Sequence, residues 1–258
     1  KNCQKTFEDL KDGRERIEKI CRELLKNEII VALGCTEPGT IAYAAACAKE
    51  ILGAIPNHME IYVSGNILKN VKSVVIPNTQ NLKGIAEAAF CGIVGGNPKR
   101  KLEVLNTLTM ADVEMVRKLV AEENMYDVHL SRVQEPLYVR VELIRGEHTS
   151  LVEIQKNHLN ITKVQKDGKD ITRQYQYREC VGEVNGSEYK LKLKDIYNFA
   201  YETEIGDLEN LMKLQITHNG RIAEEGMKND YGAKVGKNYL KLHEKETSRI
   251  SGIRSSRK

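Results

Sequence analysis

The sequence predicts an α+β protein in which helical layers flank a central, mainly antiparallel sheet. Two observations support this class. Segments near both ends of the chain repeat apolar residues at helical spacing, whereas residues 126–178 alternate apolar and polar residues, as in strands with one wet face. We expect residues 1–240 to form a single domain and residues 241–258 a basic tail.

The N-terminal half predicts helices that enclose one short strand. Apolar residues close to 3.6-residue spacing predict a helix over 6–27. Small residues in "GTIAYAAACAKEIL" and "LKGIAEAAFCGIVGG" predict two closely packed helices, the second ended by glycine. "MEIYVSG" reads as a strand, and Thr109 is placed to cap a helix over 110–122.

The second half predicts a sheet followed by further helices. Five segments between 126 and 178 alternate in period two, with Gly146 and Asp167-Gly168 at turn positions, which predicts an antiparallel meander. "LKDIYNFAYE" and "DLENLMKLQITHNGRIAEEGMKN" then predict helices.

Composition argues against several function classes. The net charge is only +4, Trp is absent and Phe occurs three times, so no basic and aromatic surface for nucleic acid is expected. No apolar run reaches the roughly 20 residues that cross a bilayer, and no signal peptide is visible, which favours a cytoplasmic protein without a membrane partner. None of the six cysteines forms a CxxC pair, so they are expected to be free thiols.

Cys35 stands apart from the other cysteines because it lies in the polar loop "GCTEPGT" ahead of a helix. A thiolate at a helix N-terminus is stabilised there, and it can ligate a metal or act as a nucleophile. The alternative is a plain cap, with Thr36 capping the helix and Pro38 in its first turn.

Three other polar stretches are candidates for chemistry. "SGNILKN" (64–70) ends a strand and opens a helical turn, so its backbone N–H groups suit an anion, although these residues alone favour a strand end capped by Ser64 or Asn66. His148 and His158 can carry protons near neutral pH. Asn219 lies inside a predicted helix, facing either a ligand or solvent.

The segments "LGCTEP", "IYVSGNILKNVKSVVIPNT", "LKGIAEAAFCGIVGGNP", "HTSLVEI" and "NGRIAEEG" resemble, in this order, the L-cysteine desulfidase family, which is related to the α chain of iron–sulfur L-serine dehydratase. The resemblance implies a lyase that converts L-cysteine into hydrogen sulfide, pyruvate and ammonia. It further implies a [4Fe–4S] cluster with Cys35 as one ligand, and no pyridoxal phosphate.

The chain departs from that family where it stops, because the second half of the family supplies the other two cluster cysteines. The cluster is therefore expected to be absent from this chain, and the chain to be inactive alone. A complementing C-terminal half or a homodimer is the expected partner. A non-catalytic remnant, or a subunit that binds a small amino acid or carboxylate, is the alternative.

The expected site places Cys35 in one pocket with residues 64–70. Glu37 is to hold the substrate ammonium, and N–H groups and side chains of 64–70 its carboxylate. Lys69 and His148 are the expected catalytic residues, with His148 as the proton carrier. The expected substrate-binding residues are Thr36, Glu37, Ser64, Gly65, Asn66, Asn70, His158, Asn160 and Asn219.

Overall fold

The computed structural model describes residues 13–179 and 191–243, which divide into two compact units. We call residues 30–184 the sheet unit, and residues 1–29 with 185–258 the helical unit. The sheet unit combines helices with a six-stranded mixed sheet, so the predicted α+β class is confirmed. Contacts thus cluster in two units along the stretch that was expected to form one domain.

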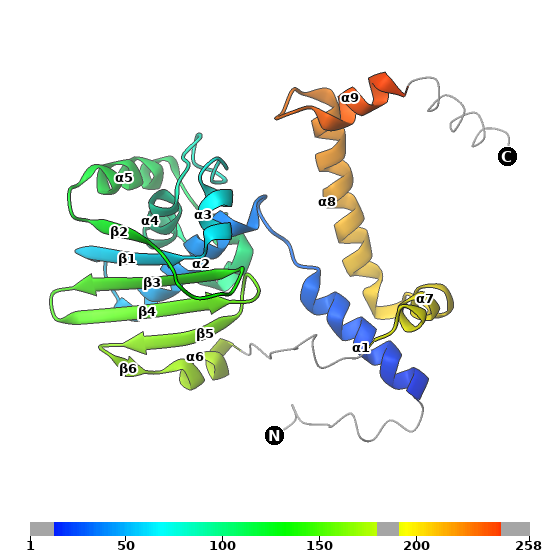
Figure 1. Ribbon diagram of the computed structural model, residues 1–258, viewed down its shortest axis with the longest axis horizontal. Helices are drawn as coiled ribbons and strands as arrows, with labels where there is room; N and C mark the ends of the chain where they lie inside the picture. Colours follow the sequence, from blue (N-terminus) through cyan, green and yellow to red (C-terminus); the bar gives the residue numbers. More distant parts are fainter. Residues whose placement is uncertain (1–12, 180–190, 244–258) are drawn as a thin grey trace. The chain divides into compact units, whose positions relative to one another are not determined.

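The strands of the sheet unit lie in the order β2-β1-β3-β4-β5-β6 (Figure 1). Only β1 and β2 are parallel; every other neighbouring pair is antiparallel. The strand bounds are β1 His58–Val63, β2 Tyr126–Leu130, β3 Tyr138–Arg145, β4 His148–Gln155, β5 Ile161–Lys166 and β6 Lys169–Asp170.

The prediction of an antiparallel meander over 126–178 is wrong for its first and last segments. Strand β1 from the first half of the chain lies between β2 and β3, so β2 has no antiparallel partner in the meander. At the other end, Asp170 accepts a hydrogen bond from the Thr172 backbone N–H at 2.8 Å. This local bond ends the strand and begins α6 (Thr172–Glu179), where period-two alternation had predicted more sheet.

Two helices of small residues form the layer behind the sheet. Helix α2 (Thr36–Leu52) packs on β3 and β4, and α4 (Ile85–Gly95) packs on α2. A Cβ added to Gly92 would lie 2.1 Å from the backbone oxygen of Ala42, so the two helices approach as closely as glycine allows. Helix α3 is Gly65–Val71, the 3₁₀ helix η2 is Pro98–Glu103 and α5 is Met110–Ala121.

Local capping fixes the start of α5 as the sequence predicted. The Thr109 hydroxyl accepts from the Asp112 N–H at 3.2 Å, and Asp112 accepts from the Thr109 N–H at 2.8 Å. This reciprocal pair is a capping box.

The helical unit contains α1 (Gly13–Glu28), α7 (Leu193–Glu202), the 3₁₀ helix η4 (Gly206–Leu208), α8 (Glu209–Lys228) and α9 (Val235–Leu242). Arg22 of α1 donates to the backbone oxygens of Glu204 and Ile205 and pairs with Asp207. The part of the first predicted helix over 6–12 and the tail over 244–258 lie outside the described residues. No helix in the described ranges is long and apolar enough to cross a membrane.

Candidate functional site

The polar loop ahead of α2 holds a thiol and a carboxylate in direct contact. The helix begins at Thr36, so Cys35 occupies the N-cap position, and its side chain makes no cap bond. Its Sγ instead donates to Oε2 of Glu37 at 2.9 Å. Thr36 as the cap is therefore wrong, because the helix starts one residue earlier than that interpretation requires.

Glu37 is the centre of a small hydrogen-bonded group. Besides the thiol, its carboxylate accepts from the Asn70 side-chain amide at 2.9 Å, and the Thr36 hydroxyl lies 3.4 Å from Oε2. The bond from Cys35 holds the pKa of Glu37 below its ordinary value, and the Asn70 bond acts in the same direction. Glu37 is therefore a half-buried anion at neutral pH.

The same contacts keep Cys35 in its thiol form. Burial raises the pKa of Cys35, and the hydrogen bond with Glu37 raises it further. Backbone N–H groups at the helix start oppose this, but the net direction is upward. The thiolate that a helix N-terminus predicts is therefore not the resting form, because an anionic carboxylate shares the site.

His158 joins this group from the turn between β4 and β5. Its Nδ1 lies 2.8 Å from the Thr40 hydroxyl and its Nε2 lies 3.1 Å from the Thr36 hydroxyl. The Thr40 hydroxyl donates its proton to the Thr36 carbonyl at 2.9 Å. Toward His158 the Thr40 oxygen can therefore only accept, and the hydrogen bond comes from Nδ1–H. This bond leaves Nε2 unprotonated and able to accept a proton.

Burial lowers the pKa of His158, while the charge of Glu37 opposes that shift in part. The imidazole is thus neutral near pH 7, with its basic nitrogen joined to Glu37 through the Thr36 hydroxyl. We call Cys35, Thr36, Glu37, Thr40, Asn70 and His158 the Cys35 cluster. It combines a neutral base, an ordered carboxylate and a thiol, which are groups that can bind an ammonium and move a proton.

The expected meeting of Cys35 with residues 64–70 is present through Asn70. Ser64 serves another purpose: it is 4% exposed, its hydroxyl donates to the Pro136 carbonyl at 2.7 Å, and it caps α3. Gly65, Asn66 and Lys69 are exposed on α3, and no polar contact joins them to the Cys35 cluster among the described residues.

His148 does not share a site with Cys35, contrary to expectation. It is exposed at the start of β4 and faces Asp167 at 3.4 Å. Two residues on, the Ser150 hydroxyl donates to the Ala48 carbonyl near the end of α2. Cys35 is at the other end of this helix, and since each helical residue adds about 1.5 Å, Ala48 lies roughly 20 Å from it along the axis. The strand end that carries His148 is therefore beside the end of α2 opposite to Cys35.

The remaining two candidates also lie apart from the cluster contacts. The Asn160 side chain donates to the Gln155 carbonyl at 3.1 Å and so shapes the turn that carries His158. Asn219 is exposed on α8 of the helical unit. Thr40 was not among the predicted site residues, although its hydroxyl is fully buried in an alanine-rich helix and therefore requires a partner.

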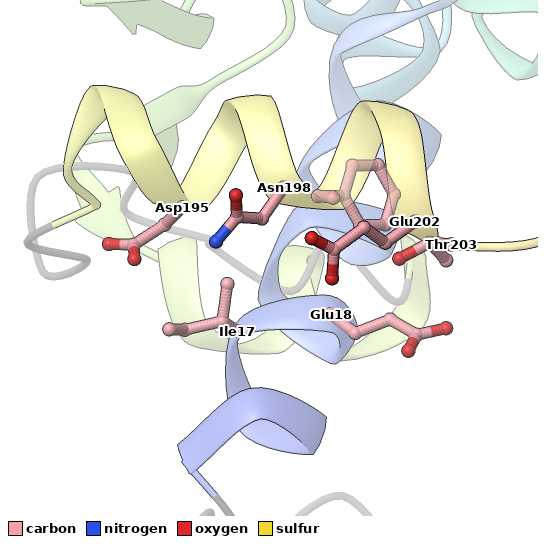
Figure 2. A pocket seen from close by; sticks show the side chains of 7 residues that line it. Ile17, Glu18, Asp195, Asn198, Glu202 and Thr203 are labelled. Carbon is pink, nitrogen blue, oxygen red and sulfur yellow. The ribbon is translucent and has the colours of Figure 1, made fainter.

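The helical unit contains a hollow of about 260 Å³ between α1 and α7. Figure 2 shows the side chains of Ile17 and Glu18 on one side, with Asn198 and Glu202 on the other. Glu18 is already paired with Arg22 at 2.9 Å. None of the predicted site residues lines this hollow.

The cysteines of the described residues do not fit a [4Fe–4S] cluster. Cys47 and Cys91 are 0% exposed in the core of the sheet unit, and Cys21 is buried in α1. Cys35 is the partly exposed thiol of this group, and a cubane cluster takes several thiolates. Cys3 and Cys180 lie outside the described residues.

Comparison with known proteins finds relatives that are named UPF0597 protein. A UPF0597 protein of Lachnoclostridium phytofermentans is 39% identical over 222 residues, covering 86% of this chain and 52% of the relative. UPF0597 proteins of Fusobacterium nucleatum (38% over 234 residues; 89% and 53% covered) and Finegoldia magna (40% over 216 residues; 83% and 51% covered) are similar in the same way. No family model matches the chain, and no solved structure matches it.

These relatives correct the family that the motifs suggested. They are named UPF0597 protein rather than L-cysteine desulfidase, so assignment to the desulfidase family is wrong. Their name states no activity. The chain spans about half the length of the curated relatives it matches, and over that half it is similar to proteins named UPF0597.

Proposed function

We propose that the Cys35 cluster is one side of the active site of an amino-acid lyase acting on L-cysteine or L-serine. The observation that carries the proposal is the neutral imidazole of His158, whose basic Nε2 is connected through Thr36 to the carboxylate of Glu37. A lyase needs a base for the α-proton and an anion for the ammonium. The two groups lie side by side here.

In the proposed reaction, His158 Nε2 takes the α-proton and the electron pair forms a Cα=Cβ double bond. The bond from Cβ to sulfur or oxygen breaks and its electron pair leaves with that atom, which takes the proton from His158 Nε2 and departs as hydrogen sulfide or water. The aminoacrylate then takes up water to give pyruvate and ammonia. Before the transfer, the Thr36 hydroxyl donates a hydrogen bond to Nε2 and so orients the imidazole. Once Nε2 carries the proton, the same hydroxyl can turn and donate to Glu37.

Glu37 is the proposed ammonium site. Its two oxygens already accept from Cys35 and Asn70, which fix the carboxylate in one orientation. Carboxylate oxygens have lone pairs for a further donor, and a half-buried anion attracts a cation more strongly than an exposed one. Asn70 thus acts as a positioning residue for Glu37.

We further propose that this chain holds no [4Fe–4S] cluster by itself and depends on a complementing half. The chain spans about half the length of its relatives, and the cysteines of the described residues do not suffice. The exposed apolar side chains of Val128 and Leu130 on the edge strand β2 offer a surface for that half or for a second copy. Purified anaerobically with iron and sulfide, the chain alone is expected to bind far fewer than about four irons.

The test measures pyruvate and sulfide formed from L-cysteine, and pyruvate formed from L-serine, without oxygen. The chain is assayed alone and together with the second half of the L. phytofermentans relative. We expect activity only in the mixture, and a loss of at least about 100-fold in kcat for His158→Gln. Glu37→Gln should raise KM. His148→Gln is the matched control and should leave kcat and KM unchanged.

A subunit that only binds a small amino acid is the second candidate, favoured because only Cys35 among the cysteines of the described residues is partly exposed. Calorimetry with L-serine separates the two. Binding that depends on Glu37, without pyruvate formation in the mixture, would support the binding subunit and refute the lyase.

A further inference from the structure

A second group of chemically reactive side chains lies on the face of the sheet that points away from α2. In β1, Met59, Ile61 and Val63 are fully buried, so His58 and Glu60 point to the opposite face. The parallel pairing of β1 with β2 sets Asp127 directly beside Glu60. This group is at the start of β1, whereas Asn70 of the Cys35 cluster follows the end of that strand.

The cross-strand pairs of Glu60 are unfavourable without a cation. Asp127 is its partner on β2 and Glu142 is its partner on β3. Like charges directly opposite each other destabilise a sheet. Arg140 binds Glu142 at 2.6 Å and balances that carboxylate. Glu60 and Asp127 have no such arginine or lysine partner among the described contacts and instead face histidines.

His58 is oriented as a ligand. Its Nδ1 lies 2.7 Å from the Asn124 carbonyl, an acceptor, so Nδ1 carries a proton and donates it. In the neutral ring Nε2 then holds a lone pair, at 3.1 Å from Glu60 Oε1 and 3.6 Å from Asp127 Oδ2. A histidine fixed by a backbone carbonyl in this way is the usual arrangement behind a metal-binding nitrogen.

The spacing of the three atoms also fits the ligand set of one metal ion; without a metal, the 3.1 Å contact between His58 Nε2 and Glu60 Oε1 is a hydrogen bond. His58 Nε2 and oxygens of Glu60 and Asp127 all lie within 4.8 Å of one another. Ligands bound tetrahedrally to zinc at 2.0–2.1 Å are about 3.3 Å apart, midway between the two distances from Nε2. At 3.6 Å, the contact with Asp127 is too long for a hydrogen bond.

His129 supports Glu60 from behind. Its Nε2 lies 2.5 Å from Oε2, the oxygen of Glu60 that does not face His58. Its ring stacks on Tyr62 with centroids 4.6 Å apart, which fixes its orientation. The carboxylate is therefore held with Oε1 turned toward His58, as an outer hydrogen bond orients a metal ligand.

We propose that His58 Nε2, Glu60 Oε1 and Asp127 Oδ2 bind one divalent transition-metal ion, with Zn²⁺ the best match. A nitrogen ligand favours zinc over Mg²⁺ or Ca²⁺, which prefer oxygen alone. The Asp127 side chain is 63% exposed, so the fourth position opens to solvent. The ion would neutralise the Glu60–Asp127 pair and join β1 to β2.

The test is calorimetric titration of ZnCl₂ into protein stripped with EDTA, at pH 7.5, with every sample carrying Cys35→Ser to remove the accessible thiol. We expect one site, and at least tenfold weaker binding for His58→Gln and for Asp127→Asn. His148→Gln is the matched control, since His148 and Asp167 form an exposed histidine–aspartate pair without a third ligand. Its zinc affinity should stay within twofold of the parent. A large excess of MgCl₂ should not displace zinc.

Titration with CoCl₂ gives an independent readout. Visible ligand-field bands without the strong near-ultraviolet absorption of a cobalt–thiolate bond are expected, and Asp127→Asn should remove them. Zinc binding that is unchanged in both variants, or absent from the parent, would show that the group is only a salt-bridge network. Should His58→Gln fail to fold, Asp127→Asn decides alone, because it is nearly isosteric and exposed.

Discussion

Replacing Thr40 by valine tests the geometry on which the Cys35 cluster depends. Thr40 is 0% exposed, and valine has almost the same shape, so the change opens no cavity. It removes one hydroxyl that makes two hydrogen bonds: it accepts from His158 Nδ1 at 2.8 Å and donates to the Thr36 carbonyl at 2.9 Å.

The cost follows from the group that loses its partner. The His158 ring is half-buried, and in Thr40→Val its Nδ1–H has no acceptor. A buried donor left without a partner costs about 1–3 kcal/mol. Thr40→Ser keeps the hydroxyl and should recover most of this stability, apart from the loss of one methyl group, worth about 1 kcal/mol.

Because the chain has two units, the assay must follow the sheet unit alone. Native-state hydrogen exchange of β3 and β4 amides reports its free energy of unfolding. The imidazole ¹⁵N shifts of His158 report the tautomer: wild type should show a protonated Nδ1, and Thr40→Val a mixture. Stability within about 0.5 kcal/mol of wild type, together with an unchanged tautomer, would refute the assigned hydrogen bonds.

Three further outcomes are expected. Gly92→Ala should destabilise the sheet unit by at least ~2 kcal/mol, because its Cβ would lie 2.1 Å from a backbone oxygen of α2. Gly39→Ala is the control: its Cβ would make ordinary contacts at 3.7 Å, so hydrogen exchange should show a change in stability of less than about 1 kcal/mol. Glu37→Gln should speed alkylation of Cys35 by iodoacetamide at pH 8, because the carboxylate raises the pKa of that thiol. His158, whose pKa burial lowers, contributes stability above pH 6.5 that is lost as pH falls toward its folded pKa, and His158→Gln should remove this part of the pH profile.

Each of these has a clear contrary result. Equal stability of the two glycine variants would mean that α2 and α4 do not touch as described. The alkylation is read by mass spectrometry, with Cys91 as the internal control because burial raises its pKa to about 12. An unchanged rate at Cys35 would contradict its bond to Glu37. A wild-type profile that rises as pH falls below 6.5, relative to His158→Gln, would contradict a buried neutral imidazole.

The fold class was predictable because it follows from local periodicity. Runs of small residues predicted α2 and α4, and Thr109 predicted the start of α5 through a capping bond that spans only three residues. Strand order was not predictable in this way. The insertion of β1 between β2 and β3 joins segments more than 60 residues apart, and the alternation within each strand carries no record of its neighbour.

The candidate site was also predictable only in the part that depends on local sequence. That the Cys35 loop and residues 64–70 lie close together was anticipated from two polar loops at element ends, whereas the bond that joins them, from Asn70 to Glu37, was not. The choice of His148 over His158 failed because both flank β4, and the sequence does not say which end of that strand faces Cys35. The bond from Ser150 to Ala48 decides it, since it places the His148 end beside the C-terminal end of α2.

One signal for His158 was nevertheless present in the sequence. Thr36 and Thr40 are four residues apart, so they lie on the same face of a helix that is otherwise alanine-rich. A hydroxyl buried in such a helix needs a partner beyond its own backbone. Two of them in register need a group with two polar atoms a few ångströms apart, and the two nitrogens of an imidazole meet that requirement. The threonine pair therefore favoured a polar side chain from another element opposite the first turns of α2, and in the structure the two ring nitrogens of His158 lie there, 3.1 Å from Thr36 and 2.8 Å from Thr40.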